Sequence, residues 1–595
     1  MRKSVYVCAI VVALAQSASA EYVKPETAAQ YARHLLEMKE APVPENAGAL
    51  RVAGRDNQAS GPEYYVFNNP DGGWVIISAD DCVTPVIGYS HEGSFNTSAM
   101  PANVSWWMQG VSRTIQDIKE SGIETPASVT EAWNSLASFS AVPDSGSKVI
   151  ETALWHQVDP FNKFCPVVNG ENKHAVTGCV ATAMAIICRH NRWPLNGRGV
   201  IGGYTTQTFK TYIPPYSIDS HVYDWDNMPL SDGAKKISGW TTEQKDQAAQ
   251  LMLDCGVMVN MDYTYDEGSG TLSSYVKDAF IDHLSYSDAA TYVRRSSYTL
   301  QEWFNILRRE IDANRVVFYV GVGDEGGHAF VCDGYDTDGM KLHFNWGSGG
   351  KYNGYFYTLP ELTLSDGSSF PDMQEAIIGL AADTATVELD VKPHIAFFGT
   401  RGIYGIEPIT PVDMVAGSKV SFSFGFMLNN ELYDVTFDVK VCLMDKDGSV
   451  KQEGWHESVT IPARDGYMYD FDTEEDILTV TPEFTDYFKL FVKENNGDWM
   501  PMPGDRDIFP DKEDVRCGVT PDPVILISDD CSAGQKIKLV LSLGFHPYKS
   551  VEWSVNGNAI DGAETELVSG RNVIRADVGY LDGSTGSIFR TVTVE

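Results

Sequence analysis

Cys179 is the side chain of this sequence best placed to act as a nucleophile. It follows Gly178, which suits a tight turn, and the apolar run from Val180 to Cys188 predicts a buried helix. At the first turn of that helix the thiol would face unpaired backbone N–H groups and the positive end of the helix dipole. Both features stabilise a thiolate. We therefore predict a thiol pKa below its ordinary value and a nucleophile that is available near neutral pH.

His328 could serve this thiol as a base. It lies about 150 residues further along the chain, in the range known for catalytic cysteine–histidine pairs. A glycine pair precedes it, which lets the backbone approach a ligand closely, and an apolar strand from Ala329 to Asp333 follows. An imidazole beside the thiol would take its proton during attack and return it to the leaving amine.

Two further stretches supply groups that such a pair needs. The strand after that of His328 carries Asn345 and Trp346, and antiparallel pairing would bring one of them beside the imidazole to orient it. Gln157 precedes the nucleophile, and its amide could join the Cys179 backbone N–H in holding an oxyanion. Each residue alone more often has a structural role. Their joint order, Gln, Cys, His and Asn, favours catalysis.

The overall composition excludes several classes of protein. The chain has 595 residues, is 43% hydrophobic and carries a net charge of -36, which argues against a nucleic-acid partner and against docking on anionic lipid. A basic start, the apolar run Val5 to Ala15 and the small residues up to Ala20 predict a signal peptide, residues 1–20, and hence a secreted, cell-surface or periplasmic protein. No later run reaches transmembrane length.

The cysteines do not form a disulfide framework or a metal site. Nine remain after residue 20, scattered along the chain, so we expect a free thiol, no metal ion and no cofactor. Cys517 and Cys531 could pair across a short loop, although the sequence does not give the geometry.

Residues 21–147 predict a small α+β module. A Pro- and Gly-bearing stretch from Ser140 to Lys148 looks like an exposed linker that a protease could cut. The expected elements are a helix at Thr27–Met38, strands at Tyr64–Phe67, Trp74–Ser78 and Pro85–Tyr89, and a helix at Asn103–Ser121.

Residues 148–384 hold the chemistry and predict an α+β domain, with helices first and antiparallel strands after. Besides the Cys179 helix, the expected helices are Thr242–Asp254, Leu272–His283 and Leu300–Ala313. The expected strands are Val316–Val322, Ala329–Asp333, Lys341–Trp346 and Gly354–Thr358.

Residues 385–595 predict only strands. Apolar and polar residues alternate from Val435 to Leu443, and turn signals such as Asn556-Gly557 recur to the end. We expect two β-sandwich modules, residues 385–517 and 518–595, and Trp553 suggests that the second is immunoglobulin-like.

The chain resembles the streptopain family of secreted bacterial cysteine peptidases. The resemblance spans roughly residues 25–382. It is carried by Trp155-His156-Gln157, Thr177-Gly178-Cys179-Val180-Ala181-Thr182-Ala183-Met184-Ala185, Gly327-His328-Ala329-Phe330-Val331 and Asn345-Trp346-Gly347, and by Gly73-Trp74-Val75-Ile76-Ile77-Ser78-Ala79-Asp80-Asp81 in the first module.

The resemblance implies a papain-like core, an inhibitory propeptide at 21–147 and endopeptidase activity on proteins or peptides. It carries the nucleophile to Cys179, the general base to His328 and the oxyanion glutamine to Gln157, with Asn345 and Trp346 orienting or shielding the imidazole. It also implies substrate-backbone contacts at Ser269 and Gly327. Ser348 departs from the family pattern, which has a second tryptophan at this position. The resemblance implies that this tryptophan helps to form the wall of the substrate groove.

Two other functions stay open at this stage. The same cysteine and histidine could transfer an acyl group to an amine, which would create isopeptide bonds instead of new N-termini. The chain could also be a non-catalytic surface binding protein, whose C-terminal modules contact a cell surface, a glycan or a protein. The intact set of site residues favours a secreted endopeptidase made as a zymogen.

Overall fold

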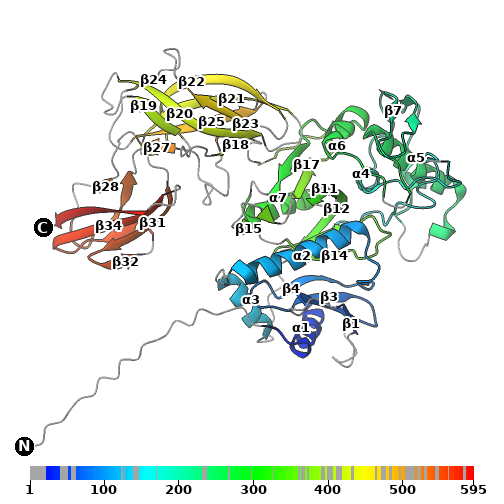
Figure 1. The fold of residues 1–595 in the computed structure, drawn as a ribbon, viewed down its shortest axis with the longest axis horizontal. Coiled ribbons are helices and arrows are strands. Elements are labelled where there is room, and N and C mark those ends of the chain that lie inside the picture. Colours follow the sequence, from blue (N-terminus) through cyan, green and yellow to red (C-terminus); the bar gives the residue numbers. More distant parts are fainter. Residues whose placement is uncertain are drawn as a thin grey trace, which may run out of the picture. The chain divides into compact units, whose positions relative to one another are not determined.

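A computed structural model describes residues 22–39, 51–54, 62–121, 125, 127–137 and 146–594, with short gaps in the last range, most of them beyond residue 359 (Figure 1). It divides into two compact units, one of residues 1–295 and 299–389 and the other of residues 296–298 and 390–595. The expected signal peptide and most of the expected linker lie outside the described residues.

The first unit begins with what we call the N-terminal module, residues 22–137. Helix α1 starts with Pro25 in its first turn, where a missing N–H is harmless, and buries Ala28, Ala32 and Leu35 against the strands. Its elements are α1 (Pro25–Met38), β1 (Arg51–Gly54), β2 (Tyr64–Asn68), β3 (Trp74–Ser78), β4 (Val86–Ser90), α2 (Ala102–Ser121) and α3 (Ala127–Ala137). The predicted elements are confirmed, and α3 adds a helix that the sequence analysis did not predict.

The rest of this unit is the central module, residues 146–389. Its helices precede most of its strands, so the predicted α+β order is confirmed. The main elements are β5 (Ser147–Val149), α4 (Cys179–Asn191), α5 (Thr242–Met258), α6 (Ser274–Asp278), β10 (Thr291–Arg294), α7 (Leu300–Asp312), β11 (Val317–Gly323), β12 (Gly326–Asp336), β13 (Lys341–Asn345), β14 (Gly354–Tyr357) and β17 (Gln374–Ile378). The expected helix at Leu272–His283 is split into α6 and a π-helical turn at Ala279–His283.

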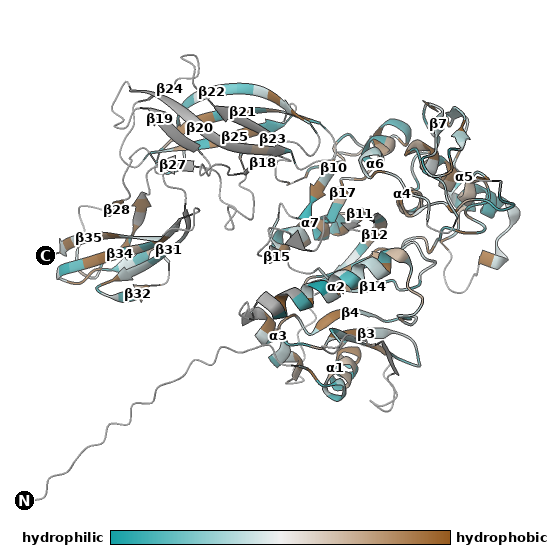
Figure 2. Cartoon of the chain, viewed as in Figure 1, coloured by the Kyte–Doolittle hydropathy of each residue, from teal (hydrophilic) through white to brown (hydrophobic). Residues whose placement is uncertain are grey.

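One antiparallel sheet joins the two modules. Its order is β1-β2-β3-β4-β14-β13-β12-β11-β17-β10, with β5 paired to β12. The junction is the β4–β14 pair, in which Tyr89 lies opposite Tyr355 and Gly88 opposite Phe356. A Cβ atom at Gly88 would lie only 2.9 Å from the Tyr355 carbonyl oxygen, so glycine permits this close approach. Figure 2 shows that β4 is strongly hydrophobic, as expected for a strand covered on both sides.

Buried polar contacts reinforce this junction. The Tyr89 ring stacks on Tyr355 at 4.8 Å, and its hydroxyl donates to Asp336 at 2.6 Å. Lys39 forms an ion pair with the same carboxylate at 2.8 Å. Burial by itself lowers the pKa of Lys39, but the hydrogen bond and charge of Asp336, with Asp338, outweigh it and raise that pKa. The N-terminal module is therefore docked by apolar, aromatic and charged contacts together.

The second unit consists of antiparallel sheets. Two five-stranded sheets contain β18 (Ile395–Phe398), β19 (Ile406–Thr410), β20 (Ser418–Asn429), β21 (Val435–Met444), β22 (Val450–Ile461), β23 (Gly466–Asp470), β24 (Leu478–Val480), β25 (Tyr487–Glu494), β26 (Met500–Pro501) and β27 (Arg516–Gly518). A four-stranded sheet follows, with Trp553 on the internal strand β31 (Tyr548–Val555) beside β34 (Gly570–Tyr580).

The all-β prediction for this part of the chain is confirmed. Its division at residue 517 stays a prediction. Cys531 lies outside the described residues, so the pairing with Cys517 also stays a prediction. Among the described residues, no helix is long and apolar enough to cross a membrane.

Candidate active site

Cys179 is the first residue of α4, as predicted. The turn before it needs glycine, because Gly178 has φ 87° and a Cβ atom there would lie 2.7 Å from the carbonyl oxygen of Ser269. The Thr182 hydroxyl donates to the Gly178 carbonyl at 2.8 Å, and this bond ties the loop before Cys179 to the first turn of the helix. The sequence thus places the thiol at a helix N-terminus through one glycine and one threonine.

The thiol of Cys179 meets backbone groups from two elements. Backbone hydrogen bonds from Ala329 on β12, and from Val180 and Cys179 on α4, favour the thiolate and lower the pKa. Burial has the larger effect, and the pKa of the thiol is raised. The residue as a whole keeps some exposed surface, but its sulfur is surrounded by protein atoms. The predicted lowering of the pKa is therefore wrong for this form of the chain.

This raised pKa predicts how the uncleaved chain reacts with iodoacetamide. A thiol with a raised pKa is almost wholly protonated at neutral pH, so alkylation of Cys179 should be slow there and still rise with pH beyond 9.0, the ordinary thiol pKa. Peptide mapping of the alkylated chain between pH 6 and pH 10 measures this rate, with glutathione as the reference thiol. A rate that levels off below neutral pH would contradict the raised pKa.

His328 lies on β12, next to the backbone contact of the thiol. The β11–β12 pairing sets it opposite Gly321, and the following residue, Ala329, is the one whose backbone reaches the Cys179 sulfur. His328 is half-buried. The fold therefore brings the strand of the predicted base against the helix of the predicted nucleophile.

Trp106 of α2 occupies the space in front of this strand. Its ring lies 6.5 Å from the His328 ring. A Cβ atom at Gly321 would come within 1.9 Å of the indole, so the tryptophan rests directly on the bare glycine backbone. The N-terminal module thus places a large buried aromatic side chain at the predicted base, which the sequence analysis did not foresee.

The neighbouring Trp107 enters an aromatic cluster of the central module. Its ring lies 5.0 Å from Phe344 and 6.1 Å from Trp346, and Asn103 of the same helix donates to the Trp346 carbonyl at 2.8 Å. The only sequence signal for this docking is a Trp-Trp pair on a predicted helix, which equally fits the module's own core.

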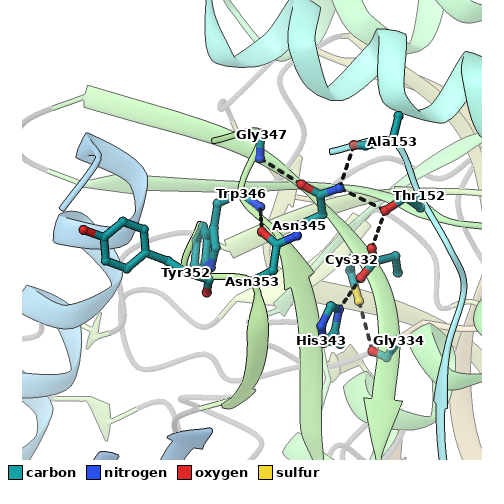
Figure 3. A network of polar contacts seen from close by, with 11 residues as sticks. Thr152, Ala153, Cys332, Gly334, His343, Asn345, Trp346, Gly347, Tyr352 and Asn353 are labelled. Carbon is teal, nitrogen blue, oxygen red and sulfur yellow. Dashed lines mark hydrogen bonds and ion pairs between the residues drawn. The ribbon is translucent and has the colours of Figure 1, made fainter. Parts of the chain in front are cut away.

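Asn345 is the last residue of β13, which pairs with β12, and Trp346 directly follows the strand. Asn345 is fully buried, and the hydrogen bonds of its amide go to Thr152, Ala153 and Gly347. Trp346 packs on Phe330 at 4.5 Å, and its indole N–H donates to the Tyr352 carbonyl. Figure 3 shows the contacts of the Asn345 amide. That either residue orients the His328 imidazole stays a prediction.

Gln157, Ser269 and Gly327 also lie around the nucleophile turn or the histidine strand. The Gln157 carbonyl accepts a hydrogen bond from the Thr177 N–H, two residues before the nucleophile, and its side chain is half-buried. The Ser269 hydroxyl is occupied with the Val176 carbonyl and the Thr264 N–H, which leaves its backbone for any substrate contact. Gly327 is exposed beside His328. Their predicted roles stay predictions.

Two known protein families match the two modules. Residues 155–356 match the peptidase C10 family, and residues 20–115 match the Spi protease inhibitor family. The first match spans the segments that carry Gln157, Cys179, His328 and Asn345, and the second ends inside α2.

Individual relatives match across both modules. The thiol protease/hemagglutinin PrtT of Porphyromonas gingivalis is 33% identical over 57% of this chain and 39% of its own length. Streptopain of Streptococcus pyogenes is 31% identical over 54% of this chain and 82% of its own length. The solved prointerpain A fragment of Prevotella intermedia is 26% identical, over 56% of this chain and 98% of that one, with a TM-score of 0.43. This chain thus spans well under half of PrtT but most of streptopain.

Proposed function

This chain belongs to the peptidase C10 family, the family of streptopain, with a papain-like α+β core, and we propose that it is a secreted cysteine endopeptidase made as a zymogen. The observation that carries the proposal is the meeting of α4 and β12, where the backbone of Ala329 contacts the Cys179 sulfur and His328 is the residue before it. Cysteine proteases use this combination of helix-terminal thiol and imidazole for acyl transfer.

The proposed reaction has two steps. The Cys179 sulfur forms a bond to the substrate carbonyl carbon, the peptide C–N bond breaks, and the amine leaves with the proton that His328 took from the thiol. Water then attacks the thioester carbon while His328 takes a water proton, the C–S bond breaks, and the sulfur receives that proton from His328 as the carboxylic acid product forms. The Cys179 backbone N–H and the Gln157 amide would stabilise the oxyanion of both intermediates.

The N-terminal module is the inhibitory propeptide in this proposal. Three features support it: Trp106 rests on Gly321 beside His328, β4 extends the catalytic sheet at β14, and Lys39 and Tyr89 bind Asp336. The first blocks the approach to the base, and the others hold the block in place. The raised pKa of the Cys179 thiol agrees with a latent form.

The remaining parts of the chain have proposed roles of a coarser kind. Residues 1–20 would direct export and be removed, so that the enzyme acts on proteins or peptides outside the inner membrane. The two C-terminal β modules, residues 385–517 and 518–595, would contact a cell surface, a glycan or a protein. In the described residues of these modules the regular elements are strands, an architecture that is common among such binding domains.

A thiol-directed epoxide inhibitor of cysteine peptidases tests the proposal on the full chain. Under reducing conditions the chain should cleave casein and create new N-termini, and the epoxide should stop cleavage and add its mass to the peptide that contains Cys179. Cleavage that continues with the epoxide bound elsewhere would overturn the proposal. New isopeptide bonds without new N-termini would instead indicate acyl transfer to amines.

A further inference from the structure

The amide of Asn345 is held by the segment that follows β5. Its Nδ2 donates to the Thr152 hydroxyl at 2.9 Å and to the Ala153 carbonyl at 3.0 Å, and its Oδ1 accepts from the Gly347 N–H at 3.1 Å (Figure 3). A backbone carbonyl only accepts and a backbone N–H only donates, so these partners fix which end of the amide is nitrogen. Both amide N–H groups are used, and Oδ1 keeps acceptor capacity.

Thr152 is itself oriented from the other side. Its hydroxyl donates to Asp333 Oδ2 at 2.6 Å, while Oδ1 of the same carboxylate contacts Nδ1 of His343 at 2.5 Å. A carboxylate only accepts, so the Thr152 hydrogen points to Asp333 and a lone pair is left for Asn345. The Ile150 N–H also donates to the Asp333 carbonyl at 2.8 Å and fastens the segment to β12.

The residues that link Asp333 to Asn345 are buried. Thr152 is 5% exposed, Asp333 2% and Asn345 0%. In such surroundings a lost hydrogen bond leaves an unsatisfied partner instead of a hydrated one, so the amide has one strongly preferred orientation.

From this geometry we propose that Thr152 is a positioning residue of the catalytic site. By consuming the N–H groups of Asn345, Thr152 and Ala153 leave Oδ1 as the part of the amide able to accept a hydrogen bond from an imidazole N–H. Such a bond would orient His328 in the active enzyme. This inference rests on the proposed function. It gives a positioning role to the segment that follows the proposed propeptide.

Four variants of the full chain test this role, each activated by a trace of tagged wild-type enzyme that is then removed. Thr152→Val should lower kcat roughly 10- to 100-fold with KM changed about threefold or less, since the defect is one of orientation. Thr152→Ser keeps the hydroxyl and should restore kcat to within about threefold of wild type. Because Thr152 acts through Asn345, Thr152→Val combined with Asn345→Ala should lose no more than Asn345→Ala alone.

Thr358→Val is the matched control. Thr358 is fully buried, and within the described part of the chain its hydroxyl has no hydrogen-bond partner, so this variant should keep wild-type kcat. If Thr152→Val does not fold, Thr152→Ala removes the same hydroxyl without placing a methyl group against Asp333, and the same loss of kcat is expected.

The outcomes separate this inference from the proposed function. Wild-type kcat in Thr152→Val, or in Thr152→Ala where Thr152→Val does not fold, would overturn the positioning role alone. So would losses that multiply in the double variant. A wild-type chain that hydrolyses nothing would overturn the proposed function and this inference with it.

Discussion

The full chain with Cys179→Ala is expected to hydrolyse no peptide bond at a measurable rate, with kcat/KM at least about 10,000-fold below wild type. In the proposed mechanism no thioester can form without the sulfur, and the proposed oxyanion donors and His328 could only assist direct attack by water. The loss should persist after another protease has removed the N-terminal module. Cleavage of casein and of a short peptide substrate measures it.

Cys188→Ala is the matched control for this prediction. Cys188 lies on the same helix, fully buried, so the substitution removes the same atom from α4 but not from its N-terminus. This variant should keep wild-type activity, and the small cavity that it leaves should lower the free energy of unfolding only slightly. If Cys179→Ala and wild type cleave casein equally, Cys179 is not the nucleophile, and the C-terminal modules become the place to look for function.

Local sequence features were sufficient to predict the elements that carry the site. Gly178 and the apolar run after it determine the start of α4, because the turn needs a positive φ and the helix needs a buried face. The same holds for the hairpin at Asn556-Gly557, where both residues have positive φ and connect β31 to β32 (Asn558–Ile560). Such signals lie within a few residues of the structure they determine.

Contacts between distant segments could not be predicted in this way. The β4–β14 pair joins the two modules, but nothing in the sequences of these strands shows that they pair with each other, because any exposed strand edge can pair. The pKa of the Cys179 thiol was predicted from the helix N-terminus alone, but burial by the surrounding elements reversed its direction. Both depend on what packs against a segment, which its own sequence does not state.

Two residues that matter for the proposals were missed for the same reason. Thr152 has no motif around it, and its role appears only because β5 pairs with β12 and brings the following segment to Asp333 and Asn345. From its sequence context, Trp106 looks like a core residue of an amphipathic helix. Only the absence of a side chain at Gly321, on a strand more than two hundred residues away, shows where the indole lies.

In the uncleaved chain, Trp106→Ala is expected to raise the rate at which an inhibitor reaches Cys179 by about 30-fold or more. A buried tryptophan at the centre of an interface contributes roughly 2 kcal/mol or more to binding when truncated, which corresponds to that factor. With the indole gone, the N-terminal module no longer covers the Gly321–His328 pair. The rate at which the epoxide inhibitor labels Cys179 in full-length protein, sampled before any cleavage, should rise accordingly, and processing should be faster.

Two comparisons decide whether Trp106 acts through this contact. Gln109→Ala changes an exposed residue of the same helix and should leave labelling unchanged. Gly321→Ala attacks the contact from the other side, because its methyl group would meet the indole at 1.9 Å, and it should speed labelling of the uncleaved chain as Trp106→Ala does. Combined, the two substitutions should have no more effect than the larger one alone, since either removes the same contact. Slow labelling in both single variants would show that the Trp106 contact is not what slows the labelling, and that the other contacts of the N-terminal module are sufficient.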